Sequence, residues 1–506
     1  MTMKNVSFTQ SRQTTAKKRA AVAATLAVSL LLLLLCAPLS ALAADSAAQT
    51  AVAITSAPAA QSVNIVLDGV AVTSDVAPYI DGNDHVMAPV KVICDSIGAK
   101  TDWESATQTV TIQETTGGTV ELQIGSPTLT VKENGEEKSI IMDTAPAIID
   151  GRTFVPLRFI AEALNLSAGW GADTHTVFLV TPGSGSYRFA DESVTIDAGA
   201  GYPLGGTLSI PDGVTGPCPC VVLVSGSGPN DRDETIYTNK PFRDIAVYLA
   251  SKGIAVLRYD KRTYSYGAKM VQELGIGITV EQEYIQDAVA AAELVKSDPR
   301  IDSDRVYILG HSEGGMLAPR IDASGGDFAG IIIMAGSMRN LEDIMYDQIM
   351  AQAQLYEGTE YYDLAMAQVA QIKQGFDSIK AMSDDEAKST NMNDIVGPAL
   401  GGSVSAYYYK EMSEHPAAGY INDTAKPFLV LQGMSDIQVY PNVDFKAYED
   451  LFAGRANAEL KTYDGLTHLF ITATPDDVVG NPNVYTTPGH VDTQVLADIA
   501  SWVGAN

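Results

Sequence analysis

The sequence predicts an α/β protein with a doubly wound, mostly parallel sheet and a helical cap insertion, preceded by a small α+β repeat domain. Three observations indicate this arrangement. Apolar runs of strand length alternate with helical stretches in the second half of the chain, residues 338–418 interrupt this alternation, and residues 63–181 contain an internal repeat. The chain has 506 residues, which is long enough for two or more domains.

Six apolar runs define the expected sheet. They are residues 221–224, 255–257, 306–309, 331–334, 428–431 and 460–463. Continuous rather than alternating apolar residues are typical of strands buried on both faces of a parallel sheet. Helical stretches, among them residues 242–251 and 281–296, lie between the runs. This order predicts a doubly wound layer structure over residues 187–506. We expect it to begin with a hairpin formed by residues 194–196 and 207–210.

The repeat in residues 63–181 has a spacing of 67 residues, which separates Pro89 from Pro156 and Trp103 from Trp170. Each copy predicts a short strand, an Asp-Gly turn, one helix and a further strand. We expect both tryptophans to be buried in the core of the repeat. A platform on which a ligand stacks is the alternative.

The beginning of the chain resembles an export segment. Residues 1–44 hold basic residues at 17–19, a leucine run at 30–35 and small residues for cleavage at 41–43, which together predict a secretory signal. An uncleaved membrane anchor is the alternative, because the apolar run is nearly long enough to span a bilayer. Residues 45–62 have a linker composition. We therefore expect a protein that is secreted or associated with a bacterial cell envelope.

Charge and cysteine content exclude several classes of protein. The net charge of −28 opposes binding to nucleic acid. Cys94, Cys218 and Cys220 are expected to be small buried hydrophobic residues, so the fold does not depend on disulfides. No histidine stands near them with the spacing of a zinc site, and we expect neither a metal nor a cofactor.

A candidate nucleophile lies at the end of one predicted strand. Residues 306–309 lead into the sequence GHSEG, and a helix-compatible segment follows. A strand that enters a tight turn and leaves as a helix exposes the residue in the middle, here Ser312. Glycine is needed at Gly310 and Gly314 because side chains there would collide where strand and helix cross. An ordinary serine in a glycine turn is the alternative.

A serine hydroxyl needs a base to accept its proton, and the base must be oriented by an acid. The histidines after Ser312 are His415, His468 and His490. His468 follows the predicted strand at residues 460–463 across a short loop, whereas His415 lies in the insertion and His490 in a late loop. We therefore predict His468 as the base.

The acid is expected where the preceding strand ends. Residues 428–433 run into Met-Ser-Asp, so Asp436 is placed to orient the histidine. Asp444 and Asp464 are the alternatives for this role. Asp436 itself has the alternative role of a helix N-cap.

An oxyanion requires two backbone N–H groups aimed at one point. One is expected from Glu313, directly after the nucleophile. The second is expected from the loop at residues 225–231, where we nominate the N–H of Ser227. The carboxylate of Glu313 is expected to contact a neighbouring base such as Arg262 and to take no part in the reaction.

With these residues identified, the second half of the chain resembles the α/β-hydrolase superfamily. More narrowly, it resembles exported bacterial esterases through GSGPNDRD at residues 226–233, RYDKR at 258–262 and GHSEGG at 310–315. The resemblance implies hydrolysis of carboxylic esters, mostly of short acyl chains, by Ser312, His468 and Asp436.

The first half resembles the copper-amine-oxidase N-terminal-like, or stalk, domain. The resemblance is carried by DGRTFVPLRFIAEAL at residues 150–164 and by the two tryptophans that follow the helices. It implies a non-catalytic envelope module and not an oxidase. Isolated His85 and His175 give no copper site.

The insertion at residues 338–418 reads as helices at 341–355 and 361–379, rich in Met, Ala, Gln and Tyr. In a hydrolase of this architecture it is expected to cover the carboxyl ends of the strands as a cap. Its methionines and tyrosines either line an acyl pocket or pack the core of the cap itself.

The sequence therefore predicts a secreted serine carboxylesterase that acts on a small-molecule ester. One alternative is a serine peptidase or aminopeptidase of the same fold, which would need an acidic site for a free N-terminus. Glu357, Glu360 and Glu414 are candidates for that site. A second alternative is a cell-envelope binding protein with secondary hydrolase activity, in which the N-terminal domain contacts cell wall or polysaccharide.

Overall fold

The computed structural model describes residues 63–506 apart from residues 115–116, 134–135, 172–174, 182–185, 200, 398–403 and 482. The predicted signal segment (1–44) and linker (45–62) lie outside the described residues. In the part of the chain that the structure describes, no helix is both long and apolar enough to cross a bilayer. The three cysteines in that part are buried free thiols.

The N-terminal domain consists of three small sheets and two helices around a common core, counted over the described residues. Its elements are β1 (Asn64–Leu67), β2 (Val70–Ala71), β3 (Tyr79–Ile80), β4 (Val86–Pro89), α2 (Val90–Ser96), β5 (Lys100–Glu104), β6 (Thr109–Gln113), β7 (Thr119–Gln123), β8 (Thr128–Glu133), β9 (Glu136–Ile141), β10 (Ala147–Ile149), β11 (Arg152–Pro156), α3 (Leu157–Ala163), β12 (Ser167–Gly171) and β13 (Thr176–Val180). The sheet orders are β12-β13-β1-β2, β10-β11-β4-β3 and β5-β6-β7-β8-β9.

The internal repeat is present as two hairpins that each lead into a helix. Asp-Gly turns join β3 to β4 and β10 to β11, and the helices α2 and α3 follow. Pro89 and Pro156 precede these helices with φ of −64° and −63°. Pro89 pairs with Phe154 where β4 meets β11, so the two copies share one sheet.

The prediction that the two repeat tryptophans are buried is wrong. Trp103 on β5 and Trp170 on β12 are each 46% exposed. Both strands lie at the edge of their sheets, where a ring has no strand on one side to cover it. Aliphatic side chains such as Ile112 and Leu122 fill the core instead.

The second half contains the predicted sheet, with eight strands in the order β14-β15-β17-β16-β18-β19-β20-β21. These are β14 (Arg188–Ile196), β15 (Leu204–Asp212), β16 (Cys218–Val224), β17 (Ala255–Tyr259), β18 (Ile301–His311), β19 (Ile331–Met334), β20 (Phe428–Gly433) and β21 (Ala458–Tyr463). The hairpin of β14 and β15 joins β17 in antiparallel orientation, and the remaining neighbours are parallel. The predicted fold class is confirmed.

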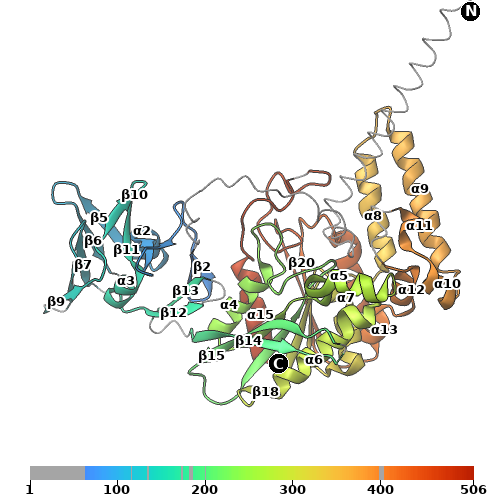
Figure 1. The fold of residues 1–506 in the computed structure, drawn as a ribbon, viewed down its shortest axis with the longest axis horizontal. Helices are drawn as coiled ribbons and strands as arrows, with labels where there is room; N and C mark the ends of the chain where they lie inside the picture. The colour runs from blue at the N-terminus through green and yellow to red at the C-terminus, as the bar shows by residue number, and fades with distance from the viewer. Residues whose placement is uncertain are drawn as a thin grey trace, which may run out of the picture.

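Helices cover both faces of this sheet (Figure 1). They are α4 (Pro241–Ser251), α5 (Arg262–Leu274), η1 (Glu281–Ile285), α6 (Gln286–Lys296), α7 (Glu313–Ile321), η2 (Asp322–Gly326), η3 (Pro441–Phe445), α14 (Lys446–Leu451) and α15 (Thr493–Ala505). Successive strand residues serve opposite cores: Val221 packs with residues of α4 and α15, and Val222 packs with residues of α6 and α7. This alternation explains why the strands are apolar without a period of two.

The cap forms the end of the molecule farthest from the N-terminal domain (Figure 1). It consists of α8 (Leu341–Gln354), α9 (Tyr362–Ile379), α10 (Asp384–Ser389), α11 (Met392–Val396), α12 (Ala406–Glu414) and α13 (Ala417–Asn422). An ion pair of 2.5 Å between Arg320 on α7 and Glu411 on α12 joins it to the sheet domain. Met392, Tyr408 and Tyr409 of the cap are buried in the largest hydrophobic core. These large side chains therefore serve to pack the cap.

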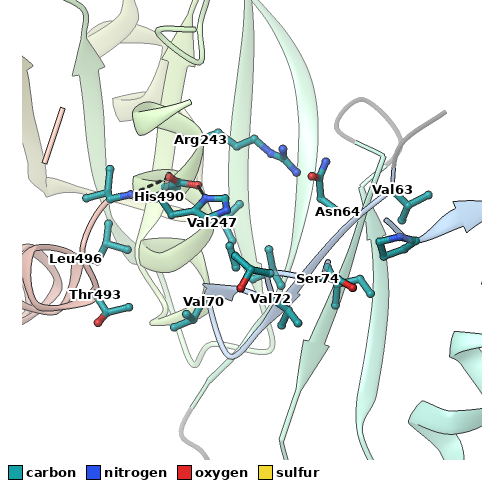
Figure 2. Close-up of a pocket in the computed structure, with 18 of the residues that line it drawn as sticks. Val63, Asn64, Val70, Val72, Ser74, Arg243, Val247, His490, Thr493 and Leu496 are labelled. Atoms are coloured by element: carbon teal, nitrogen blue, oxygen red, sulfur yellow. Dashed lines mark hydrogen bonds and ion pairs between the residues drawn. The ribbon is translucent and has the colours of Figure 1, made fainter. Parts of the chain in front are cut away.

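The two halves meet along an apolar contact. The rings of Phe178 on β13 and Phe189 on β14 have centroids 4.2 Å apart. A cavity of about 310 Å³ lies beside this contact, and Figure 2 shows Val70 and Val72 facing Val247 and His490 across it. The junction is therefore hollow on one side.

Candidate active site

Ser312 occupies a strained turn between β18 and α7. Its φ of 54° and ψ of −118° are unusual for a residue with a side chain. A Cβ on Gly310 would lie 2.1 Å from the carbonyl oxygen of Gly314, and one on Gly314 would lie 2.2 Å from that of Val224. Only glycine fits at either position, so the sequence folds here into the elbow that the motif predicts.

Asp436 and His468 form a buried pair on neighbouring loops. His468 Nδ1 lies 2.7 Å from Asp436 Oδ2. The other carboxylate oxygen, Oδ1, accepts hydrogen bonds from the backbone N–H groups of Gln438 at 2.8 Å and Val439 at 3.0 Å. The carboxylate is thus fixed by its own loop, and it holds the imidazole in one orientation.

The loops after β18, β20 and β21 bring Ser312, Asp436 and His468 to the same edge of the sheet. The ring centroids of His468 and His311, the residue before Ser312, are 4.7 Å apart. The second ring nitrogen of His468, Nε2, is buried and makes no hydrogen bond to any residue that the structure describes. That nitrogen is the atom that a catalytic base uses.

The alternative residues have other partners. Asp444 accepts hydrogen bonds from Ser337 at 2.6 Å and Arg339 at 2.8 Å, and Asp464 is exposed. His490 Nδ1 lies 3.0 Å from Asp244 at the domain junction, and His415 Nδ1 lies 2.8 Å from the hydroxyl of Tyr420 in the cap.

Ser227 and Glu313 line the same small cavity as Ser312. The loop that carries Ser227 is held from below by Lys261, whose ammonium group donates to the carbonyl oxygens of Gly226 and Gly228, each at 3.0 Å. The side chain of Asn230 donates to the Ser227 carbonyl, also at 3.0 Å. The loop is therefore rigid where one of the two pre-aimed N–H groups would be needed.

The expected contact between Glu313 and Arg262 is wrong. Arg262 forms a buried ion pair of 2.5 Å with Asp287 on α6. The Glu313 carboxyl instead contacts the hydroxyls of Ser227 and Tyr408. Arg262 begins helix α5 and packs toward α6, which supplies its acid.

The sequence interpretation missed His311 and Glu234. His311 Nε2 donates to the carbonyl of His468 at 2.9 Å, and its Nδ1 lies 2.9 Å from Glu234. Burial lowers the pKa of His311, but Glu234 and the His468 carbonyl raise it more, so that the net shift is upward. Glu234 also accepts the N–H of Gly226 at 2.6 Å. The position of His311 inside the nucleophile motif was the sequence signal that could have identified it.

Comparison with known proteins gives the family. The model described as copper amine oxidase N-terminal domain matches residues 66–179, and the one described as serine aminopeptidase, S33, matches residues 238–474. Esterase EstD of Thermotoga maritima is 34% identical over 316 residues, which are 62% of this chain and 68% of that protein. The chain belongs to the α/β-hydrolase esterases. It carries an N-terminal domain of the copper amine oxidase type. Both resemblances expected from the sequence are therefore confirmed.

Solved structures of esterases are also similar to this esterase. Est1E from Butyrivibrio proteoclasticus is 16% identical, with a TM-score of 0.38 over 62% of this chain and 99% of that one. Esterase PF2001 of Pyrococcus furiosus is 15% identical, with a TM-score of 0.36 over 64% and 93% of the two chains.

Replacement of Gly314 by alanine tests the elbow. The new methyl group would lie 2.2 Å from the Val224 carbonyl oxygen, and a backbone atom cannot yield easily. We expect Gly314→Ala to lower the free energy of unfolding by about 3 kcal/mol or more. Urea denaturation measures this. Gly419→Ala in α13, where nothing lies within 4 Å, is the matched control and should change little. Equal stability of both variants would contradict the elbow geometry.

Proposed function

We propose that this esterase hydrolyses short-chain carboxylic esters through an acyl-enzyme on Ser312, with His468 as the base and Asp436 as the acid that orients it. The observation that carries the proposal is the 2.7 Å contact between His468 and Asp436 beside the Ser312 elbow. No metal or cofactor enters the proposed reaction.

We infer the tautomer of His468 from its contacts. Nδ1 donates to the Asp436 carboxylate, so Nε2 carries a free lone pair and accepts the Ser312 proton as Oγ attacks the ester carbonyl. The N–H groups of Ser227 and Glu313 stabilise the oxyanion. The imidazolium then returns its proton to the leaving alcohol. Water, activated by the same nitrogen, finally hydrolyses the acyl-enzyme.

The cavity at Ser312 favours a short acyl chain. Its volume is about 30 Å³, and a single water molecule already needs about 10–15 Å³. The apolar residues that line it are Met316, Leu341, Ile344, Met345 and Val439. One methionine of the cap, Met345 on α8, is among these lining residues. We infer that this space takes an acetyl group and that α8, which supplies Leu341, Ile344 and Met345, limits longer chains.

The peptidase alternative has less support. Glu313 is the one acidic residue that lines the cavity beside Ser312, counted over the described residues. Of the acids considered for a free N-terminus, Glu357 and Glu360 are exposed, and Glu414 is paired with Lys410.

Export is a further part of the proposal and depends on residues 1–44. The basic residues, the leucine run and the small residues before position 45 support a cleaved signal. Secretion or attachment to a bacterial envelope would bring the N-terminal domain into contact with the cell surface.

A second function is favoured for the N-terminal domain, namely binding of a cell-surface polysaccharide. Trp170 stands at 46% exposure in a cavity of about 610 Å³. Phe159 also lines this cavity, as does Asp143, which bridges His85 at 3.3 Å and Arg158 at 2.8 Å. Aromatic side chains beside polar groups are suited to a sugar ring, which has an apolar face and hydroxyls at its edge.

Ser312→Ala tests the nucleophile. We expect it to reduce kcat for p-nitrophenyl acetate by at least about 10³-fold, since the residual rate comes from the oxyanion hole and binding alone. An aminoacyl p-nitroanilide, assayed in parallel, should be a poor substrate of the wild type. Unchanged ester turnover in the variant, or faster turnover of the amide in the wild type, would contradict the proposal.

Met345→Ala tests the acyl cavity. Loss of the side chain lengthens the space, so kcat/KM for the hexanoate ester should rise relative to the acetate by about tenfold or more. Met350→Ala on the same helix is the control, because Met350 packs against the core and does not line the cavity. An equal change in the hexanoate-to-acetate ratio in both variants would show that Met345 does not limit the length of the acyl chain.

Trp170→Ala tests the polysaccharide site. The chain has three tryptophans, and Trp502 is buried, so a soluble glycan can quench only Trp103 and Trp170 by direct contact. Soluble cell-wall glycan should quench the wild type and the Trp103→Ala variant in a saturable manner. It should leave Trp170→Ala unchanged. Saturable quenching that survives in Trp170→Ala, or no quenching of the wild type, rejects this site.

A further inference from the structure

A buried hydrogen-bond chain joins the cap to the loop of Ser227. The phenol oxygen of Tyr408, on α12, lies 3.0 Å from Glu283 Oε2 and 3.0 Å from Glu313 Oε1. The second oxygen of Glu313 accepts a hydrogen bond from the Ser227 hydroxyl. All four side chains are at most 5% exposed. Water is therefore largely excluded as a competing partner, and the protein itself must satisfy each polar group.

These contacts require a proton on one of the two acids. A phenol has one hydrogen, so Tyr408 donates to one carboxyl group and must accept from the other. An ionised carboxylate can only accept. For both 3.0 Å contacts to be hydrogen bonds, either Glu283 or Glu313 is a neutral acid.

Glu283 is the acid with a positive partner. Its Oε1 lies 3.1 Å from Lys261 Nζ and 3.0 Å from the Thr263 hydroxyl, and both groups donate. The Glu313 carboxyl contacts two hydroxyls instead. Burial raises the pKa of Glu313, Lys261 opposes this shift, and Glu283 adds to it, with a net rise. The proton therefore belongs on Glu313.

We propose that Glu313 is a neutral carboxylic acid and a positioning residue that holds the two N–H donors of the oxyanion hole at a fixed separation. The donors belong to Glu313 and Ser227, and the side chains of these residues are joined to each other. Tyr408 fixes the same carboxyl group from the cap. This inference rests on the proposed function, because the oxyanion forms only in acyl transfer.

The neutral state matters for the chemistry. A carboxylate at this position would repel the negative charge that develops on the substrate oxygen, and in a buried site such repulsion is strong. The neutral acid avoids it and still makes two hydrogen bonds. Because Tyr408 belongs to the cap, the geometry of the oxyanion hole also depends on the cap being packed in place.

Glu313→Gln and Glu313→Ala test the proposal. Glutamine reproduces the neutral acid, with its carbonyl accepting from Ser227 and its amide donating to Tyr408. We expect Glu313→Ala to lower kcat by about 100-fold, because a misplaced donor costs that much. Glu313→Gln should keep most of what alanine loses, with KM for the acetate ester little changed in both.

The pH profile separates a neutral acid from a merely structural residue. Because the pKa of Glu313 is raised, the group stays neutral to higher pH and ionises above that pKa. The kcat of the wild type should therefore fall on the alkaline side, and Glu313→Gln, which cannot ionise, should lack this fall. The other titratable groups around this site are Lys261, Glu283, Tyr284, Tyr408 and Tyr409.

Two phenols of the cap supply a matched pair of controls. Tyr408→Phe removes the bridging hydroxyl and should lower kcat by about fivefold, the value of one hydrogen bond. Tyr409→Phe removes a buried hydroxyl that has no hydrogen-bond partner among the described residues, and it should leave kcat unchanged. Thermal unfolding of each variant shows whether it is folded.

Three results would overturn the inference. They are equal losses in Glu313→Gln and Glu313→Ala, an alkaline fall in kcat that persists in Glu313→Gln, and retention of activity by Glu283→Gln while Glu313→Gln is inactive. The last result would put the proton on Glu283. Failure of the proposed function would be distinguishable, because Ser312 of the wild type would then not be labelled by an alkyl phosphonate.

Discussion

The left-handed backbone at Ser312 is the constraint on which the active site depends. A φ of 54° is unfavourable for serine, and it persists because β18 is paired on both sides within the sheet while α7 packs closely against it. The N–H of Ser312 donates to the carbonyl of Met334 at 2.9 Å, which ties the elbow to β19. Without this strain the hydroxyl would not stand at the carboxyl edge of the sheet, where the loops of Asp436 and His468 end.

The elbow is surrounded by buried polar side chains, most of which lie beside a polar partner. His311 and Glu234 connect the elbow to the His468 loop and to the N–H of Gly226. Lys261 contacts the loop of Ser227 and forms an ion pair with Glu283. Partly satisfied buried groups are costly, so each acid in this region has a cation, a hydroxyl or an N–H beside it. These contacts restrict how the loop of Ser227 and the Ser312 elbow can move relative to each other.

Much of the fold followed from local sequence. Runs of β-branched and aliphatic residues marked five of the six predicted strands of the sheet, because strands buried on both faces tolerate few polar residues. The sixth, β21, lies at the edge of the sheet and carries Lys461 and Thr462. The glycines of the motif fixed the elbow, and chain order pointed to Asp436 and His468. The small repeat was readable because proline and tryptophan recur at one spacing.

What remained beyond the sequence depends on contacts between distant segments. The exposure of Trp103 and Trp170 follows from the edge positions of β5 and β12, which no local pattern gives. Arg262 pairs with Asp287 and not with Glu313, because the packing of α5 against α6 brings Arg262 and Asp287 together. The chain from Tyr408 to Ser227 joins residues of the cap, the elbow and a loop that are far apart in the sequence. Such partners are set by the packing of whole elements.

Trapping the covalent intermediate tests the central claim most directly. A short-chain p-nitrophenyl alkylphosphonate, incubated with the full chain and followed by proteolysis and mass spectrometry, should add one phosphonyl group to the peptide that contains Ser312, with simultaneous loss of esterase activity. Modification of another residue, or loss of activity without modification of Ser312, would contradict the account.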